Sequence, residues 1–167
     1  PQFMSGTHTL TVALFGLLRT GDTLLAATGR PYDTLEGVIG IGDAGKGCGT
    51  LREFGVNYDE CPLLPDFTPD YDLIAEKART ATVVHIQRSR GYTQRNAFDL
   101  ATIQKVADTA RKANPNAVIF VDNCYGEFTQ TAEPVAFGAD IMAGSFIKNT
   151  GGGITPTGGY IAGRKDL

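Results

Sequence analysis

Short apolar segments alternate with helix-like segments along this chain, and several of the apolar segments have no polar face. The clearest are ATVVHIQ (81–87), AVIFVDN (117–123) and ADIMAGS (139–145), with shorter ones at TLLAATG (23–29) and GGYIAG (158–163). Strands that are apolar on both faces are typical of parallel sheets, whose two faces are covered by helices. The chain therefore predicts an α/β fold with a largely parallel sheet.

Helices are predicted between these strands. The first runs over 7–22 and has Gly21 as its stop, and a second, over 30–39, has Pro31 in its first turn. A third is expected over 68–78 and a fourth over 99–113. We expect Thr68 to cap the third helix and Asp99 to open the fourth, because hydroxyl and carboxylate oxygens accept hydrogen bonds from free helix N–H groups.

Composition narrows the class of protein. The chain has 167 residues, enough for one domain with a core, and its net charge of −3 argues against general nucleic-acid binding. It contains no apolar run long enough to span a membrane. Three cysteines without CxxC spacing favour a reducing cytoplasm over a disulfide framework. The sequence starts abruptly at PQFMSGTHT, as expected for a segment of a longer protein.

Ligands of open α/β sheets bind outside the carboxyl ends of the strands, so the residues at those ends are candidates. One strand ends at Asp122, another at Ser145 before Lys148, and a third at Gln87 before Ser89. The first helix starts at 5–7, Ser-Gly-Thr, whose free N–H groups and positive dipole end suit a phosphate.

The stretch SFIKNTGGGITPTGGY (145–160) surrounds Lys148 with glycines and small hydroxyl residues. A lysine amine can form a Schiff base with an aldehyde. Pyridoxal phosphate needs such a lysine, a phosphate cradle and an acid that keeps its ring nitrogen protonated. Lys148, residues 5–7 and Asp122 together match that set, and the small residues leave room for the ring.

The sequence also resembles a known family. SFIKN after ADIMAG is similar to the lysine segment of fold-type-I pyridoxal-phosphate enzymes, FVDNCYGEF to their aspartate strand, and SGTHT to their phosphate-binding turn. The resemblance is nearest to the aluminium resistance proteins, a methionine γ-lyase-like group of cysteine and methionine metabolism. It implies a three-layer sandwich with a mainly parallel sheet, the large domain of such an enzyme.

The resemblance also implies a role for each candidate residue. Lys148 holds the cofactor and shuttles protons, while Asp122 faces the pyridine nitrogen. Tyr32 stacks on the ring and counts as catalytic with those two. The phosphate and phenolic-oxygen contacts fall to Gly6, Thr7, Ser145 and Tyr125, with Gln87 and Ser89 on the same rim.

The resemblance further implies a longer protein. Related enzymes are about twice this length, so residues 1–167 are expected to be the central part of the large domain, without the upstream segment and the small C-terminal domain. The full-length form is expected to be a homo-oligomer, a dimer or tetramer, acting on a small amino-acid substrate. Pro156 occupies the position where aminotransferases carry a phosphate-binding arginine, which weakens that alternative.

The expected activity is elimination of a β- or γ-thiol group from a sulfur amino acid. The alternative enzyme is an aminotransferase or aldolase on the same scaffold, which shares the first proton or bond-breaking step. A different class of function is also open: a truncated, inactive domain that only binds cofactor or a partner subunit. Each residue also has a plain structural reading: Lys148 as a solvated charge, Asp122 as a turn residue, residues 5–7 as a helix cap, and Tyr32 and Tyr125 as packing aromatics.

Other motifs are weaker. His8 and His85 are expected to be structural, and no metal site is predicted because no third ligand is near in sequence. Gly40, Gly42 and Gly45 spell GxGxxG, but without the strand before and helix after that dinucleotide binding needs. Gly47 stands where a P-loop requires Ser or Thr. We expect this segment to be a mobile loop over the active site.

Overall fold

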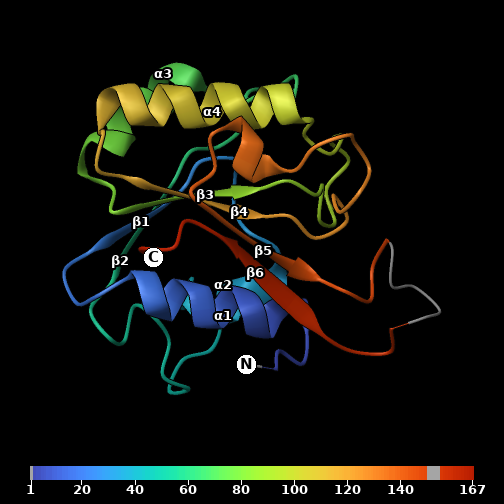
Figure 1. The fold of residues 1–167 in the computed structure, drawn as a ribbon. Coiled ribbons are helices and arrows are strands. Elements are labelled where there is room, and N and C mark those ends of the chain that lie inside the picture. Colours follow the sequence, from blue (N-terminus) through green and yellow to red (C-terminus); the bar gives the residue numbers. More distant parts are fainter. Residues whose placement is uncertain (1, 150–154) are drawn as a thin grey trace.

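The computed structural model describes residues 2–149 and 155–167, which form a six-stranded sheet flanked by helices (Figure 1). The strands are β1 (Thr23–Ala26), β2 (Asn57–Glu60), β3 (Val83–Gln87), β4 (Val118–Asp122), β5 (Ile141–Ser145) and β6 (Gly159–Gly163). Their order in the sheet is β2-β1-β3-β4-β5-β6. All neighbouring pairs are parallel except β5 and β6. The predicted α/β class with a mainly parallel sheet is confirmed.

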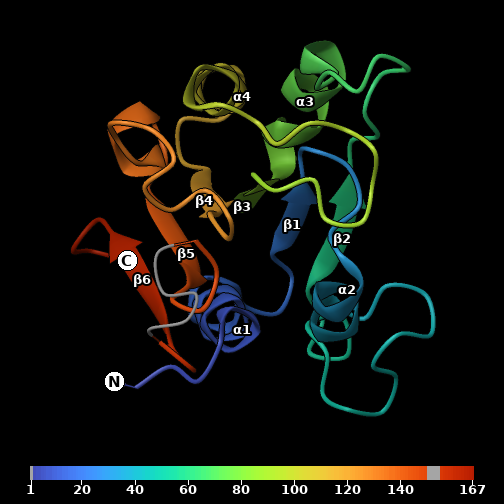
Figure 2. The ribbon, with the colours of Figure 1, turned by 90° about the vertical axis from the view of Figure 1, so that its right-hand side faces the viewer.

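Helices lie on both faces of the sheet and give three layers (Figure 2). One face carries α1 (Gly6–Leu17) and α2 (Asp33–Ile39), and the other carries α3 (Tyr71–Lys77) and α4 (Leu100–Ala113). Two short 3₁₀ turns, η1 (Ala78–Thr80) and η2 (Pro134–Phe137), complete the described elements. Among the described residues, no helix is long and apolar enough to cross a membrane.

Each face of the sheet has its own apolar core, because successive side chains of a strand point to opposite faces. On β3, Val84 and Ile86 pack with Ile103 of α4, whereas Val83 packs with Leu10 of α1. All five residues of β3 are buried. This double burial explains why the strand sequences lack a polar face.

Several predicted boundaries were wrong by a few residues. Helix α1 ends at Leu17, before Gly21, because the Arg19 guanidinium donates to the carbonyls of Phe15, Gly16 and Leu18 and takes over the helix end. Helix α2 starts at Asp33 with Tyr32 as its N-cap, which places Pro31 outside the helix.

The start of α3 was also misplaced, whereas that of α4 was correct. Asp70, not Thr68, caps α3, since its side chain accepts from Leu73 N while the Thr68 hydroxyl donates to Asp66. The predicted cap of α4 at Asp99 is confirmed. Strand β2 was missed because its sequence, NYDE, has no apolar run.

Candidate active site

A cavity of about 600 Å³ lies at the carboxyl ends of the strands, beside the start of α1. Its size is in the range of ordinary small-molecule sites. The residues that line it are Ser5, Gly6, Thr7, Tyr32, Thr34, Ser89, Arg90, Gly91, Tyr92, Ala97, Asp122, Cys124, Tyr125, Ser145, Ile147 and Lys148. The structure thus gathers eight of the nine predicted site residues around one cavity; Gln87 is the exception.

The start of α1 forms one wall. Ser5 caps the helix, its hydroxyl accepting from His8 N at 3.2 Å, so Gly6 and Thr7 contribute the first helical N–H groups. A Cβ at Gly6 would lie 3.0 Å from Cys124 Sγ and 3.1 Å from the Ser145 Cβ. Glycine therefore lets α1 approach β4 and β5 closely enough for these N–H groups to line the cavity.

Asp122, the last residue of β4, is almost fully buried, with 1% of its surface exposed. Its Oδ1 accepts from Cys124 N at 3.0 Å, and no basic side chain of the described residues forms an ion pair with it. Burial raises the pKa of this carboxyl to about 6. The cavity therefore presents a buried acid without a cationic partner in the described chain.

Lys148 follows β5 and reaches into the same cavity. Its Nζ donates to Tyr125 Oη at 3.0 Å and lies 4.5 Å from the centre of that ring. The hydrogen bond is the largest cause of a raised Lys148 pKa. Tyr125 holds a left-handed backbone conformation, with φ of 67°, on the turn that follows Asp122. Non-glycine residues adopt this conformation mainly where surrounding contacts impose it.

Tyr32 and Gln87 link α2 to β3. The Gln87 side chain accepts from Tyr32 N at 2.9 Å and donates to Ser89 O at 3.2 Å, so it supports the cavity without lining it. The Tyr32 hydroxyl shares a hydrogen bond of 3.0 Å with the Thr7 hydroxyl. Burial raises the Tyr32 pKa well above its ordinary value, which keeps the phenol protonated.

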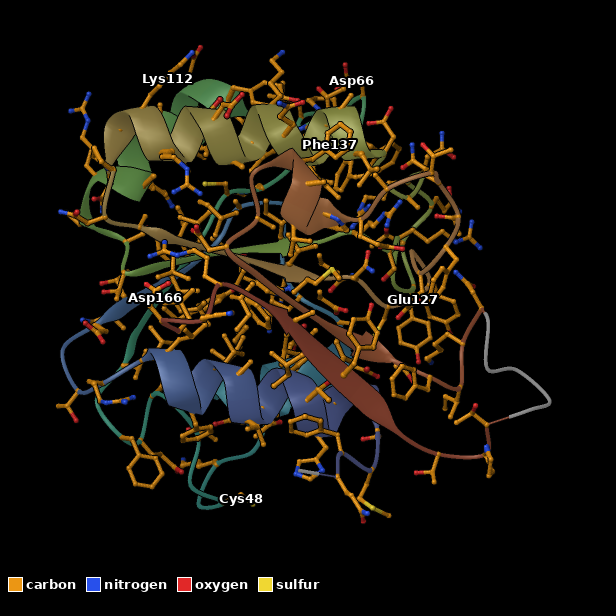
Figure 3. The ribbon with its side chains drawn as sticks, viewed as in Figure 1. Cys48, Asp66, Lys112, Glu127, Phe137 and Asp166 are labelled. Atoms are coloured by element: carbon orange, nitrogen blue, oxygen red, sulfur yellow. The ribbon has the colours of Figure 1, made fainter. Side chains whose placement is uncertain are left out.

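Sequence reasoning missed a polar network behind the cavity. Arg88, which is buried, donates to Asn123 Oδ1 at 2.7 Å, and Asn123 Nδ2 donates to Glu133 Oε2 and Tyr160 Oη, each at 2.9 Å. Glu127, in the turn after β4, lies on the side of the molecule where β5 ends (Figure 3), and its Oε1 accepts from Ser145 N at 3.1 Å. These contacts join residues 10 to 37 positions apart, so no local pattern signals them.

The glycine-rich segment 40–55 does not cover the cavity, contrary to prediction. None of its residues lines the cavity, and Cys48 at its tip lies far from Glu127 (Figure 3). Its backbone N–H groups instead bind its own carboxylate: Gly47, Gly49 and Thr50 donate to Glu53 at 2.6, 2.9 and 2.9 Å. The N–H groups of this segment are therefore bound by a carboxylate of the segment itself, whereas those of a phosphate loop face the ligand.

The histidines and cysteines form no metal site among residues 2–149 and 155–167. His85 is buried against Phe120, their ring centres 5.7 Å apart, and burial lowers its pKa to about 4. His8 accepts from Met4 N. Cys48, Cys61 and Cys124 are free. The glycines at 151–153 that follow Lys148 lie outside the described residues.

Comparison with known proteins decides the family. The sequence profile of methionine gamma-lyase matches residues 1–167. The chain belongs to the methionine gamma-lyase family. The chain is 47% identical over 165 residues to the uncharacterized protein YnbB of Bacillus subtilis, covering 98% of this chain and 39% of YnbB.

This methionine gamma-lyase family member agrees closely in fold with solved structures of its relatives. A carbon-sulfur lyase involved in aluminum resistance from Clostridium novyi NT has a TM-score of 0.91 and 48% identity, covering 98% of this chain and 39% of that one. A provisionally assigned cystathionine beta-lyase involved in aluminum resistance from Listeria innocua has a TM-score of 0.93 and 49% identity, covering 98% and 40%. The chain thus spans about two fifths of the length of these relatives.

More distant structures share the fold. The pyridoxal-5'-phosphate-dependent protein YhfS from Escherichia coli is 18% identical, with a TM-score of 0.72 over 99% of this chain and 39% of that one. The predicted fold type, that of fold-type-I pyridoxal-phosphate enzymes, is confirmed.

The chemistry of the cavity's residues suits a cofactor that carries a phosphate, a basic ring nitrogen and an aldehyde. A phosphate would meet the N–H groups at the start of α1, and a protonated ring nitrogen would supply the cationic partner that Asp122 lacks among the described residues. An aldehyde would meet the amine of Lys148, which lines the same cavity.

Proposed function

We propose that this chain is the cofactor-binding part of a pyridoxal-phosphate-dependent carbon–sulfur lyase that acts on sulfur amino acids. One observation carries the proposal: one cavity is lined by the Lys148 amine, the N-terminus of α1 and the buried Asp122 carboxylate, which has no ion-pair partner among the described residues. The family supports the reaction class, since relatives of 48% and 49% identity are described as carbon-sulfur and cystathionine beta-lyases.

The chemistry that bound pyridoxal phosphate supplies is electron withdrawal from the substrate's α-carbon. Lys148 Nζ would hold the cofactor covalently and, once the substrate's amine has replaced it there, the freed amine would take the proton from that carbon. Asp122, which is buried, would keep the ring nitrogen protonated through a charge-assisted hydrogen bond. Tyr32, which lines the cavity, would pack against the ring.

The phosphate end and the rim complete the set of roles. The N–H groups of Gly6 and Thr7 bind the phosphate together with the Ser145 hydroxyl. Tyr125, beside Lys148, would contact the cofactor's phenolic oxygen. Gln87 supports this side of the site through its bonds to Tyr32 N and Ser89 O. Cys124, whose N–H donates to Asp122, orients that carboxylate.

We also place these 167 residues within a longer protein. Because the chain spans about two fifths of its relatives, the proposal includes an upstream segment and a small C-terminal domain outside it. The complete protein is proposed to be a homo-oligomer of the cytoplasm that takes a small amino-acid substrate.

The test is a substrate panel with the full-length, cofactor-loaded protein. Cystathionine, methionine and cysteine are supplied, and the release of a thiol and of a 2-oxo acid is measured together. Joint release from at least one of them supports the lyase. With a second 2-oxo acid supplied as amino-group acceptor, conversion of the amino acid to its own 2-oxo acid without thiol release identifies an aminotransferase. Aldehyde release from a β-hydroxy amino acid added to the panel identifies an aldolase, and cofactor binding without turnover identifies a binding domain.

A further inference from the structure

Lys148 is carried by an irregular segment, because strand β5 ends three residues earlier at Ser145. The strand alone therefore does not fix where the amine lies. The turn after β4, residues 123–129, contacts this segment on both sides of the lysine. Glu127 Oε1 accepts from Ser145 N at 3.1 Å, and the Glu127 carbonyl accepts from Asn149 Nδ2 at 3.3 Å.

The same turn also carries Tyr125, whose hydroxyl accepts from Lys148 Nζ. Tyr125 O accepts from Asn149 Nδ2 as well. Since Tyr125 and Glu127 are two residues apart, a shift of the Glu127 side chain relative to β5 also shifts the hydroxyl that Lys148 contacts. Glu127 thus connects the end of β5 to the group that holds the amine.

The Glu127 side chain occupies a buried, tightly packed position that is unfavourable for a carboxylate. The side chain is 3% exposed, and its Oε2 is buried without a hydrogen-bond partner among the described residues. A Cβ at Gly144 would lie 2.5 Å from Glu127 Oε1 and 2.5 Å from Tyr160 Oη, so strand β5 needs glycine there. Burying an unpaired carboxylate oxygen is unfavourable, which argues that the contact serves more than turn stability.

We propose that Glu127 is a positioning residue that sets where the Lys148 amine lies, by holding the 123–129 turn against the end of β5. The inference rests on the proposed role of Lys148 in catalysis. The positioning role requires that Glu127 provide a hydrogen-bond acceptor for Ser145 N; it does not require a negative charge. A neutral side chain that keeps the acceptor oxygen therefore performs the same task.

The experiment compares Glu127→Ala with Glu127→Gln in the full-length protein. In the cofactor-free form, acetylation of Lys148 by acetic anhydride is followed across pH by mass spectrometry, which reports the pKa of its amine. In Glu127→Ala we expect that pKa to fall towards its ordinary value, because the Tyr125 contact that raises it loosens. In the loaded protein we expect kcat to fall about 100-fold.

Two further variants separate positioning from general destabilisation. Gly144→Ala adds a methyl group that pushes the Glu127 carboxylate aside, so we expect it to reproduce the Lys148 shift of Glu127→Ala. Ile103→Val, in the core on the far face of the sheet, lowers stability but should leave Lys148 acetylation unchanged. Glu127→Gln should remain close to the native protein in both measurements.

A native Lys148 profile and native kcat in Glu127→Ala would overturn the inference. So would a Glu127→Gln variant as impaired as Glu127→Ala, because the charge and not the acceptor would then matter. A shifted Lys148 profile in a protein that releases no thiol would support the positioning role and count against the lyase instead.

Discussion

At the scale of single residues, the buried Asp122 carboxylate is expected to lower the stability of the cofactor-free protein and to favour binding of a cationic cofactor. An acid whose pKa is raised on folding makes the folded state less stable as pH rises from its ordinary pKa to its folded pKa. For Asp122 this window runs from 3.8 to about 6. Above it, the cofactor-free protein holds a buried charge that a cationic ligand would compensate.

We therefore expect Asp122→Asn to stabilise the cofactor-free protein above pH 6 and to leave its stability unchanged below pH 4. The pKa change corresponds to about 3 kcal/mol at most. Urea unfolding at pH 4, 5, 6 and 8 measures the gain. A stability difference that is independent of pH would show that burial of the charge is not its cause.

The same substitution should have the opposite effect on the loaded protein. Asparagine cannot hold a proton on the ring nitrogen by a charge-assisted bond, so we expect modestly weaker cofactor binding and a turnover lower by roughly two to three orders of magnitude. Both are measured with the full-length protein. Near-native turnover would remove Asp122 from the proposed chemistry.

Lys148 should be the covalent attachment point of the cofactor. Lys148→Ala is expected to abolish the visible absorption band of the loaded protein and the lysine label left by borohydride reduction. Lys105→Ala is the matched control, since that amine lies over the Tyr71 ring on the far face of the sheet, 3.9 Å from its centre. A band that survives in Lys148→Ala, with another lysine labelled, would contradict the assignment.

At the scale of elements, the segment 40–55 depends on one carboxylate for its shape. Glu53 accepts from three backbone N–H groups, which lowers its pKa. We expect Glu53→Ala to speed hydrogen exchange at Gly47, Gly49 and Thr50, with Glu53→Gln intermediate. Cofactor binding should not change, because no residue of this segment lines the cavity. Unchanged protection of these amides would show that other contacts hold the loop.

The strand ends were predictable from sequence, whereas the contacts between loops were not. Asp122 and Ser145 directly end buried strands, and parallel strands bring their carboxyl ends to one edge. Glu127 gave no such signal, because its partner Ser145 is 18 residues away and a single glutamate in a turn is unremarkable. Strand β2 was invisible for another reason: an edge strand with polar residues lacks the apolar run that identifies the others.

At the scale of the whole molecule, an exposed apolar rim lies on the two segments that carry Tyr125 and Lys148 beside the cavity. We define it as Tyr125, Phe128, Phe146 and Ile147, whose exposed fractions are 56%, 75%, 43% and 40%. Phe128, like Tyr125, has a positive φ, of 56°, a backbone conformation that non-glycine residues rarely adopt. Clustered exposed aromatics favour association with another surface.

This rim and the chain's two-fifths share of its relatives' length lead to a prediction about activity. We expect the isolated 167 residues to bind pyridoxal phosphate weakly, to associate at the rim and to release little or no thiol. The longer protein should be an active homo-oligomer, because other segments would then cover the rim and supply the remaining contacts to the substrate. Sedimentation and thiol release from methionine, cystathionine and cysteine compare the two forms.

Phe128→Ser in the isolated chain should reduce association without restoring activity. A monomer of 167 residues with full lyase activity would refute the argument, since every group needed for substrate binding would then lie within this chain.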